Sequence, residues 1–278
     1  MLLRAFTCVP LLCAAGLLPA QDAREIIRRA VEQSDRNTKA ALTYTYLQRQ
    51  EVRELDGSGH VKKRTIQTWD ITPIQGSPYR RLVARDDQPL PAAEQKTEDE
   101  KLRWNNEQRR KETSEERARR VAEWQLRQER EREPVRELPD AFTFTLAGEE
   151  QVAGRPVYRI DATPKPGYKP KSQLANFFPK VKLRLWIDQQ DLQGARIEME
   201  VLDTISFGGF VLRLSKGTRL TIEQTRLGDA VWLPKQVALT ATGRILLVKG
   251  LNREFRYTFS DYKKFQVDSH VLAIAEEP

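Results

Sequence analysis

Apolar and polar residues alternate strictly in the stretch VKLRLWIDQQDLQGARIEMEV, residues 181–201. Because successive side chains of a β-strand point to opposite faces, this alternation is typical of half-buried antiparallel strands. The turn residues at its centre predict a β-hairpin with one apolar and one charged face. If Ile187 opposes Ala195, the register also pairs opposite charges and apolar side chains: Arg184 with Glu198, Lys182 with Glu200, Leu185 with Ile197, Leu183 with Met199, and Trp186 beside Arg196.

The rest of the chain predicts a helix followed by strands. Apolar residues recur at three- and four-residue spacing over Asp22–Lys39, which predicts an amphipathic helix capped by Asp22. Turns are expected at Asp56–Gly59 and Gly148–Gly154. The short spacing between strands predicts one antiparallel meander of about ten strands. Besides the hairpin, strands are expected over Leu42–Leu55, His60–Ile71, Tyr79–Arg85, from Phe142 to Leu146, and over Val157–Ala162, Phe207–Ser215, Thr218–Arg226, Val231–Thr242, Arg244–Leu251 and Arg253–Lys264.

Residues 94–133 differ in character, because 24 of these 40 residues are charged, 12 of each sign. This composition favours a helix with Glu-to-Arg pairs four residues apart, such as Glu115 with Arg119 and Glu116 with Arg120. Asn105–Asn106 is expected to break it into two arms. Two interpretations stay open: a solvated helix that touches the body at a few points, or a lid or partner-docking arm.

The apolar face of the predicted sheet has too little helix to cover it. Exposed apolar patches beyond a few hundred Å² are rare on soluble monomers unless they bind something. The sheet must therefore either close and fill itself, or curl halfway and leave a cavity for an apolar ligand. In the second case we expect these residues to line the cavity: Leu183, Leu185, Ile197, Met199, Leu212, Leu220, Ile222, Leu239, Tyr257 and Phe259. Phe177–Phe178 and nearby lysines would form a cavity mouth that meets lipid head groups, or else an ordinary linker.

The first 20 residues, with one Arg before a short apolar run, predict a secretory signal peptide cleaved near Ala20; a retained anchor is the alternative. Both cysteines, Cys8 and Cys13, lie inside it. The mature chain, predicted as one domain over 21–278 with 94–133 inserted, would then be periplasmic and free of thiols. Net charge is +8 over 278 residues. The excess is spread out without a basic stripe, so nucleic acid is not an expected partner.

Catalytic motifs are scarce. The two histidines, His60 and His270, lie far apart, and the mature chain lacks cysteine, so neither a metal site nor a nucleophile–histidine pair is expected. Paired carboxylates could support hydrolysis, but each candidate lies in a turn-like context where such residues are common: Asp86–Asp87, Glu149–Glu150, and Asp188 with Asp191. We therefore expect a protein that is not an enzyme and has no cofactor.

Three stretches carry a resemblance to a known family: TYTYLQRQEVRELDGSGHV after the first helix, YRRLVARDDQPL before the charged segment, and KVKLRLWIDQQDLQGARIEMEV. Together they resemble the LolA/LolB-like lipoprotein-carrier superfamily, which includes the RseB-like stress sensors. The resemblance implies a mainly β fold with helices, a half-open β-barrel whose concave face holds lipid chains under a helical lid.

These observations predict a periplasmic carrier for lipid or lipoprotein acyl chains in outer-membrane biogenesis, with peripheral membrane contact at the cavity mouth. The alternative is a non-catalytic protein-interaction or stress-sensor module of the cell envelope. In that case the 94–133 helix docks a protein partner and the barrel serves as scaffold.

Overall fold

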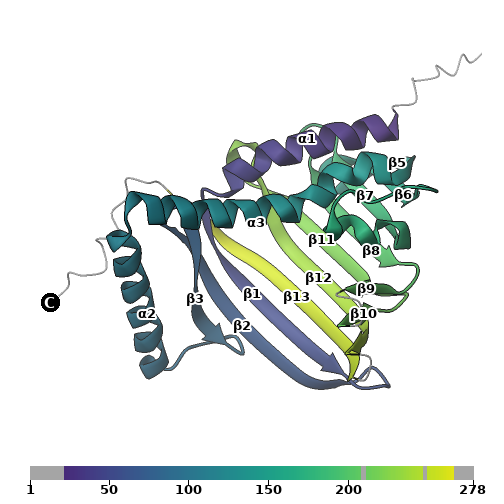
Figure 1. Ribbon diagram of the computed structural model, residues 1–278. Helices are drawn as coiled ribbons and strands as arrows, with labels where there is room; N and C mark the ends of the chain where they lie inside the picture. The colour runs from purple at the N-terminus through teal and green to yellow at the C-terminus, as the bar shows by residue number, and fades with distance from the viewer. Residues whose placement is uncertain (1–21, 208–210, 247–248, 266–278) are drawn as a thin grey trace, which may run out of the picture.

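One strongly curved antiparallel sheet dominates the computed structural model, which describes residues 22–207, 211–246 and 249–265 (Figure 1). Its strands follow the order β4-β3-β2-β1-β13-β12-β11-β8-β7-β6-β5, so that β4 and β5 form the two edges of an open half-barrel. The strands are β1 (Tyr44–Leu55), β2 (Val61–Ile74), β3 (Ser77–Arg85), β4 (Gln88–Pro89), β5 (Phe142–Val152), β6 (Arg155–Pro164), β7 (Val181–Asp188), β8 (Gly194–Val201), β9 (Ile205–Phe207), β10 (Leu212–Leu214), β11 (Arg219–Arg226), β12 (Trp232–Ile245) and β13 (Lys249–Lys264).

The predicted fold class, a half-open antiparallel barrel with helices, is confirmed. Within the described residues the sheet has 13 strands instead of about ten. The short strands β4 and β9 were not expected, β10 covers only part of the strand expected over Phe207–Ser215, and the strand expected over Arg244–Leu251 is instead the end of β12 and the start of β13. The signal peptide predicted over residues 1–20 and His270 lie outside the described residues. The turn expected at Gly148–Gly154 is shorter than predicted, because β5 continues to Val152. Its pairing with β6 shifts by one residue between Leu146 and Gly148.

The helices cover the concave side of the sheet, called here the inner face. In Figure 1, α1 runs along the upper ends of the strands, α3 crosses in front of the sheet, and α2 lies beside β3. As predicted, α1 starts after Asp22, whose side chain accepts a hydrogen bond from the Arg24 N–H at 2.9 Å. The helices are α1 (Ala23–Ala41), α2 (Ala92–Lys111), α3 (Ser114–Ala141), and the two 3₁₀ helices η1 (Gln173–Lys180) and η2 (Gly228–Ala230).

The predicted break of the charged segment at Asn105–Asn106 is wrong, because α2 continues to Lys111. The chain turns at Glu112–Thr113 instead, where Thr113 and Glu116 form a reciprocal capping box that starts α3. The capping box uses the Glu116 carboxylate, for which the sequence predicts a pair with Arg120. Arg120 binds Glu112 at 2.6 Å instead. Asparagine lowers helix propensity only modestly, whereas a capping box fixes a helix start.

The register predicted for the β7–β8 hairpin is confirmed from Lys182↔Glu200 to Trp186↔Arg196. It fails only at the turn, where Ile187 opposes Gly194, since a bulge displaces Ala195. The Lys182–Glu200 ion pair forms at 3.1 Å. Arg184 faces Glu198 but binds Asp161 of the neighbouring β6 at 2.9 Å.

The main hydrophobic core fills one end of the inner face. Side chains of β5–β8 pack there against the apolar stripe of α1, the last turns of α3 and η1. The most deeply buried include Ile27 at 2% exposure and Ile160 at 0%. Glu137 of α3 is fixed to the loop before η1, because its carboxylate accepts hydrogen bonds from the Tyr168 hydroxyl and from the N–H groups of Lys171 (2.8 Å) and Ser172 (2.7 Å). These bonds outweigh the opposing effect of burial and lower the pKa of Glu137.

Candidate functional site

Apolar side chains form two continuous rows across the inner face. In an antiparallel sheet, directly opposite residues point to the same face, so the pairing register identifies the members of each row. The rows run from β7 through β8, β11 and β12 to β13: Leu183–Met199–Leu220–Leu239–Phe255 and Leu185–Ile197–Ile222–Val237–Tyr257. Eight of the ten predicted cavity residues thus belong to these two rows on the inner face.

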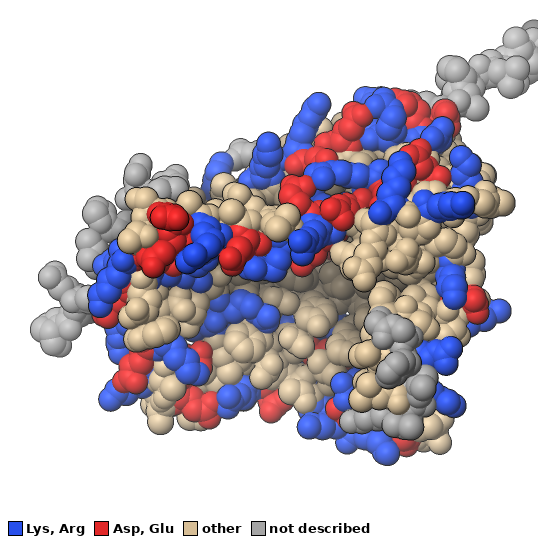
Figure 2. Space-filling model, viewed as in Figure 1, with Lys and Arg blue, Asp and Glu red and all other residues tan. Residues whose placement is uncertain are grey.

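The two rows are covered unevenly. Leu183 and Leu185 are 8% and 2% exposed and belong to the main core beneath α1 and η1, so the protein's own side chains occupy the space beside them. We therefore reassign both from the ligand cavity to the core. On β11, β12 and β13 the row residues are only half-buried. Figure 2 shows a hollow beneath α3 whose walls are largely uncharged, while charged residues gather on α1 and α3.

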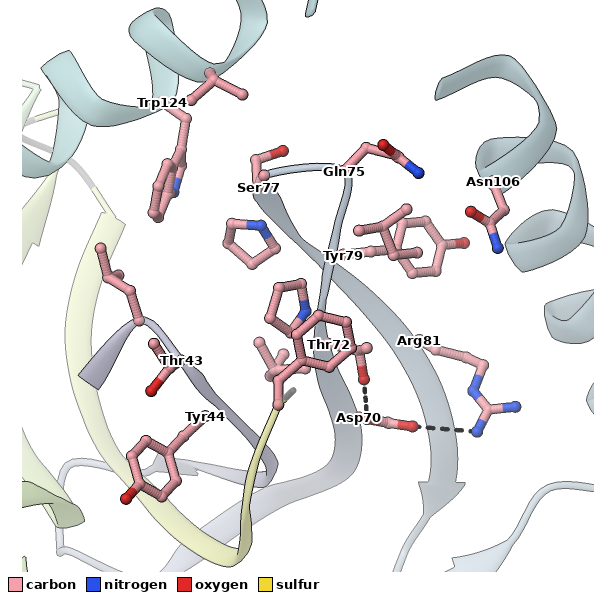
Figure 3. A pocket seen from close by; sticks show the side chains of 18 of the residues that line it. Thr43, Tyr44, Asp70, Thr72, Gln75, Ser77, Tyr79, Arg81, Asn106 and Trp124 are labelled. Carbon is pink, nitrogen blue, oxygen red and sulfur yellow. Dashed lines mark hydrogen bonds and ion pairs between the residues drawn. The ribbon is translucent and has the colours of Figure 1, made fainter. Parts of the chain in front are cut away.

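A cavity of about 1300 Å³ lies at the other end of the inner face, between β1–β3 and the hairpin formed by α2 and α3 (Figure 3). Tyr44 and Tyr46 of β1 and Ile71 of β2 line its sheet side. The Tyr46 ring lies 5.9 Å from the Phe259 ring, which connects the cavity with the half-buried part of the inner face. A volume above the roughly 300–1,000 Å³ of typical small-molecule sites suits a large, flexible ligand.

The α2–α3 hairpin supplies the opposite wall. Its few apolar residues that point inward, Leu102, Val121 and Trp124, line the cavity. The same signal was present in the sequence, where these residues stand out in a charged segment. By contrast, Trp104 of α2 is 62% exposed and lines no cavity described here. The hairpin thus acts as a cover of mixed character, whose cavity side carries these three apolar residues beside Asn106, Arg110, Arg117 and Gln125.

Two arginines of the hairpin hold the β2–β3 turn. Arg109 donates to the carbonyl oxygens of Ile74 (2.8 Å) and Ser77 (2.9 Å). Arg120 donates to the Ser77 hydroxyl (2.7 Å) and the Gln75 carbonyl (3.0 Å). Gly76 lies between them with φ +88°, and a Cβ there would approach Val121 to 3.0 Å, so glycine is required. These contacts place the corner between α2 and α3 at the cavity wall.

None of the twelve residues proposed from the sequence lines this cavity. Phe178, expected at a cavity mouth, is 4% exposed and packs against Phe142 with ring centroids 5.2 Å apart; Phe177 packs against Phe178. Both belong to the core region, because η1 turns this segment inward. Leu212 lies on the short β10, opposite Ile245 of β12. Phe259 is the predicted residue in contact with the lining, through Tyr46.

The residues that do line the cavity were not among those predicted from the sequence. The strand expected over His60–Ile71 is longer in the structure, where β2 continues through Pro73 to Ile74 beside the cavity. A proline after an alternating run argues against a central strand, and here it lies opposite Pro78 in a hairpin near the sheet edge. The paired tyrosines of TYTY were a usable signal, since both line the cavity.

At least one carboxylate of each candidate catalytic pair is bound by an arginine. Asp87 lies 2.6 Å from Arg49, and Glu150 lies 2.6 Å from Arg159. Arg155 binds the fully buried Asp188 at 2.6 Å. Hydrogen bonds from Arg49 lower the pKa of Asp87, and those from Trp186 and Arg159 lower that of Glu150. A general acid needs a raised pKa, so these pairs are suited to structure and not to acid catalysis.

Within the described residues, no group of histidine, cysteine, aspartate or glutamate side chains is arranged to hold a metal ion. No helix among them combines the length and apolar run needed to cross a membrane.

No protein-family model and no curated protein sequence matches the chain. Several solved structures are similar to it. A putative outer membrane lipoprotein-sorting protein domain from Vibrio parahaemolyticus has 10% identity and a TM-score of 0.37, covering 88% of this chain and 95% of that one. A LolA superfamily protein from Nitrosomonas europaea has 11% identity, coverage of 89% and 94%, and a TM-score of 0.31. The lipoprotein LppX of Mycobacterium tuberculosis has 13% identity, coverage of 86% and 95%, and a TM-score of 0.28.

Proposed function

We propose that this protein is an exported, non-catalytic carrier or binding protein for the acyl chains of lipids or lipoproteins. Its place of action would be the periplasm, in outer-membrane biogenesis. The observation that carries the proposal is the half-buried apolar inner face that continues, through Phe259 and Tyr46, into the large cavity under α2 and α3.

The energetics favour an apolar guest. Burial of apolar surface contributes about 25 cal/mol per Å², so an acyl chain that buries about 200 Å² would gain about 5 kcal/mol before ordering costs. Half-buried side chains such as Leu220, Ile222 and Leu239 would lose their remaining water contact in the same step. Reversible burial of this kind needs no chemical reaction. This agrees with the carboxylates that bind arginine, which are not suited to acid catalysis.

Two tryptophans provide the first test. Trp124 of α3 lines the cavity, and Trp104 of α2 is exposed on the outside of the same hairpin. Residues 21–278 would be purified from a periplasm and examined by native mass spectrometry and organic extraction. We expect co-purifying lipid in near-stoichiometric amount in the wild type and Trp104→Ala, and a several-fold loss in Trp124→Ala with an unchanged melting temperature.

The sheet side is tested in parallel. Leu239→Asp places a charge on the inner face, whereas Thr240→Asp places it on the exposed outer face of the same strand. Only the first should abolish lipid retention. A wild-type protein that is free of lipid, and whose melting temperature is insensitive to added lipid, would contradict the proposal.

A second candidate function is supported by the outer side of the hairpin, where Trp104 and Leu126 are 62% and 52% exposed. Such side chains suit an interaction or sensor module that docks a protein partner with α2 and α3. If Trp104→Ala changes the cellular function while Trp124→Ala does not, this alternative replaces the carrier.

A further inference from the structure

A second cleft adjoins the apolar cavity. It has a volume of about 640 Å³ and lies between the second half of α1 and the middle of α3. The two volumes share three lining residues, Leu42, Trp124 and Gln125. The cavity and the cleft are therefore neighbours, with Trp124 and the other two shared residues at their boundary.

The cleft differs from the cavity in charge. Four basic side chains line it, Arg36 and Lys39 from α1 with Arg132 and Arg136 from α3, against two acidic ones, Asp35 and Glu129. Arg132 and Arg136 both bind Asp35, the latter at 3.0 Å, and Arg136 also binds Glu129 at 2.9 Å. Both acidic groups of the cleft are therefore already engaged in ion pairs.

Two cationic groups of the cleft remain without an ion pair among the described residues and are available for a ligand. Arg36 and Lys39 have no ion pair within the part of the chain that the structure describes. Arg132 is only 14% exposed, and its Nε atom is buried without a hydrogen-bond partner among the described residues. A buried donor without a partner is destabilising, and Arg132 therefore retains one N–H that Asp35 does not use.

The end of α1 does not oppose an anion strongly. Helix C-termini repel negative charge through their unpaired carbonyl groups. Here the Thr38 carbonyl accepts from the Leu42 N–H at 3.2 Å, and the Ala40 carbonyl accepts from the N–H and hydroxyl of Thr43. These bonds satisfy two of the four terminal carbonyls, while Arg36 and Lys39 add positive charge to the same turn.

We propose that the protein binds an amphiphile with an acidic head group, a phosphate or a carboxylate, with its chain in the apolar cavity and its head group in the α1–α3 cleft. This proposal rests on the proposed function, because it requires the cavity to hold an acyl chain. It adds that the head group of the ligand is acidic and that it lies in the α1–α3 cleft.

The test compares three ligands of equal chain length: dodecyl phosphate, dodecanoate and the uncharged dodecanoyl glycerol. Each is titrated into residues 21–278 by calorimetry below its critical micelle concentration. We expect at least one of the two anions to bind about tenfold more tightly than the uncharged ligand, because hydrogen bonds between charged partners are the stronger ones. Added salt should reduce this preference.

The variant Arg36→Gln/Lys39→Gln should lower the preference to about twofold while leaving the affinity for dodecanoyl glycerol unchanged. Arg29→Gln/Arg103→Gln is the matched control, since it removes the same charge from exposed positions that line neither volume. Tighter binding of the phosphate would identify a phosphate-headed lipid, and tighter binding of dodecanoate a fatty acid; either result supports the proposal.

Three other results overturn it. Equal affinity for all three ligands would leave the acyl-chain function standing and remove the head-group site. A preference that survives in Arg36→Gln/Lys39→Gln but disappears in Arg110→Gln/Arg117→Gln would move the head group to the far end of the apolar cavity, which those arginines line. Failure to bind any of the three would overturn the acyl-chain function as well.

Discussion

At the β5–β8 end of the inner face, α1, η1 and the last turns of α3 cover the apolar side chains, whereas at the β1–β3 end similar side chains face a cavity of about 1300 Å³. The difference lies in the helices. α1 buries Ile26, Ile27 and Ala30, but α2 buries no residue, and the buried residues of α3 all lie in its last two turns. A charged helix can span an apolar face without filling it, so the composition of 94–133 leaves the hollow open.

The largest expected effect is a difference in the loss of stability between variants at the two ends of the inner face. Leu185→Ala, at the filled end, should lower the free energy of unfolding by about 2–5 kcal/mol, because it leaves a cavity in a closed core. Leu239→Ala, in the half-buried part of the face, should lower the free energy of unfolding by about 1 kcal/mol, since part of the Leu239 side chain is already exposed in the wild type. Chemical denaturation measures both. Equal losses would mean that the hollow end is packed as tightly as the core.

A second variant tests how α3 is fixed at the filled end. Glu137→Gln should destabilise the protein by about 1–3 kcal/mol at pH 7, because the amide cannot accept from all three donors that surround the carboxylate. The pKa of Glu137 is lowered in the folded state from 4.5, so its contribution is complete above pH 4.5 and is lost as the pH falls through the folded value.

The stabilities of wild type and Glu137→Gln should therefore converge on acidification. Their difference is the quantity to measure, since other carboxylates titrate in the same range. Among them is Glu51 on the outer face, whose pKa hydrogen bonds from Arg64, Arg49 and Arg53 lower to about 2 against the opposing effect of burial. A difference that stays constant from pH 7 to pH 3 would show that the Glu137 charge is not responsible.

The smallest effect concerns the corner of the hairpin at the hollow end. Arg120→Gln removes the bonds to Gln75, Ser77 and Glu112 and should cost less than about 1 kcal/mol of global stability. Hydrogen exchange should nevertheless accelerate in residues 75–77 and 112–121, because the corner opens locally. Arg119→Gln, an exposed neighbour, is the control. Unchanged exchange would show that the corner is held by Arg109 alone.

Trp186 shows where the sequence pattern reached its limit. By alternation it belongs to the charged face of the hairpin, yet it is 7% exposed. The guanidinium groups of Arg184 and Arg196 lie 5.9 and 5.2 Å from its ring, and its indole N–H donates to Glu150 at 2.7 Å. Alternation assigned its face correctly but could not reveal that these long charged side chains, together with an apolar cluster of Val157, Ala195 and Trp232, would bury it.

The sequence by itself determined the local structure: the capped first helix, the helical nature of the charged segment, and the β7–β8 register up to the bulge. These follow from interactions between residues close in the chain or directly paired. Only the tertiary structure decided that Leu185 and Phe178 lie in a filled core while Tyr46 and Trp124 border a cavity. The period of a strand fixes which face a side chain takes, but which helix covers that face depends on contacts between segments far apart in the sequence.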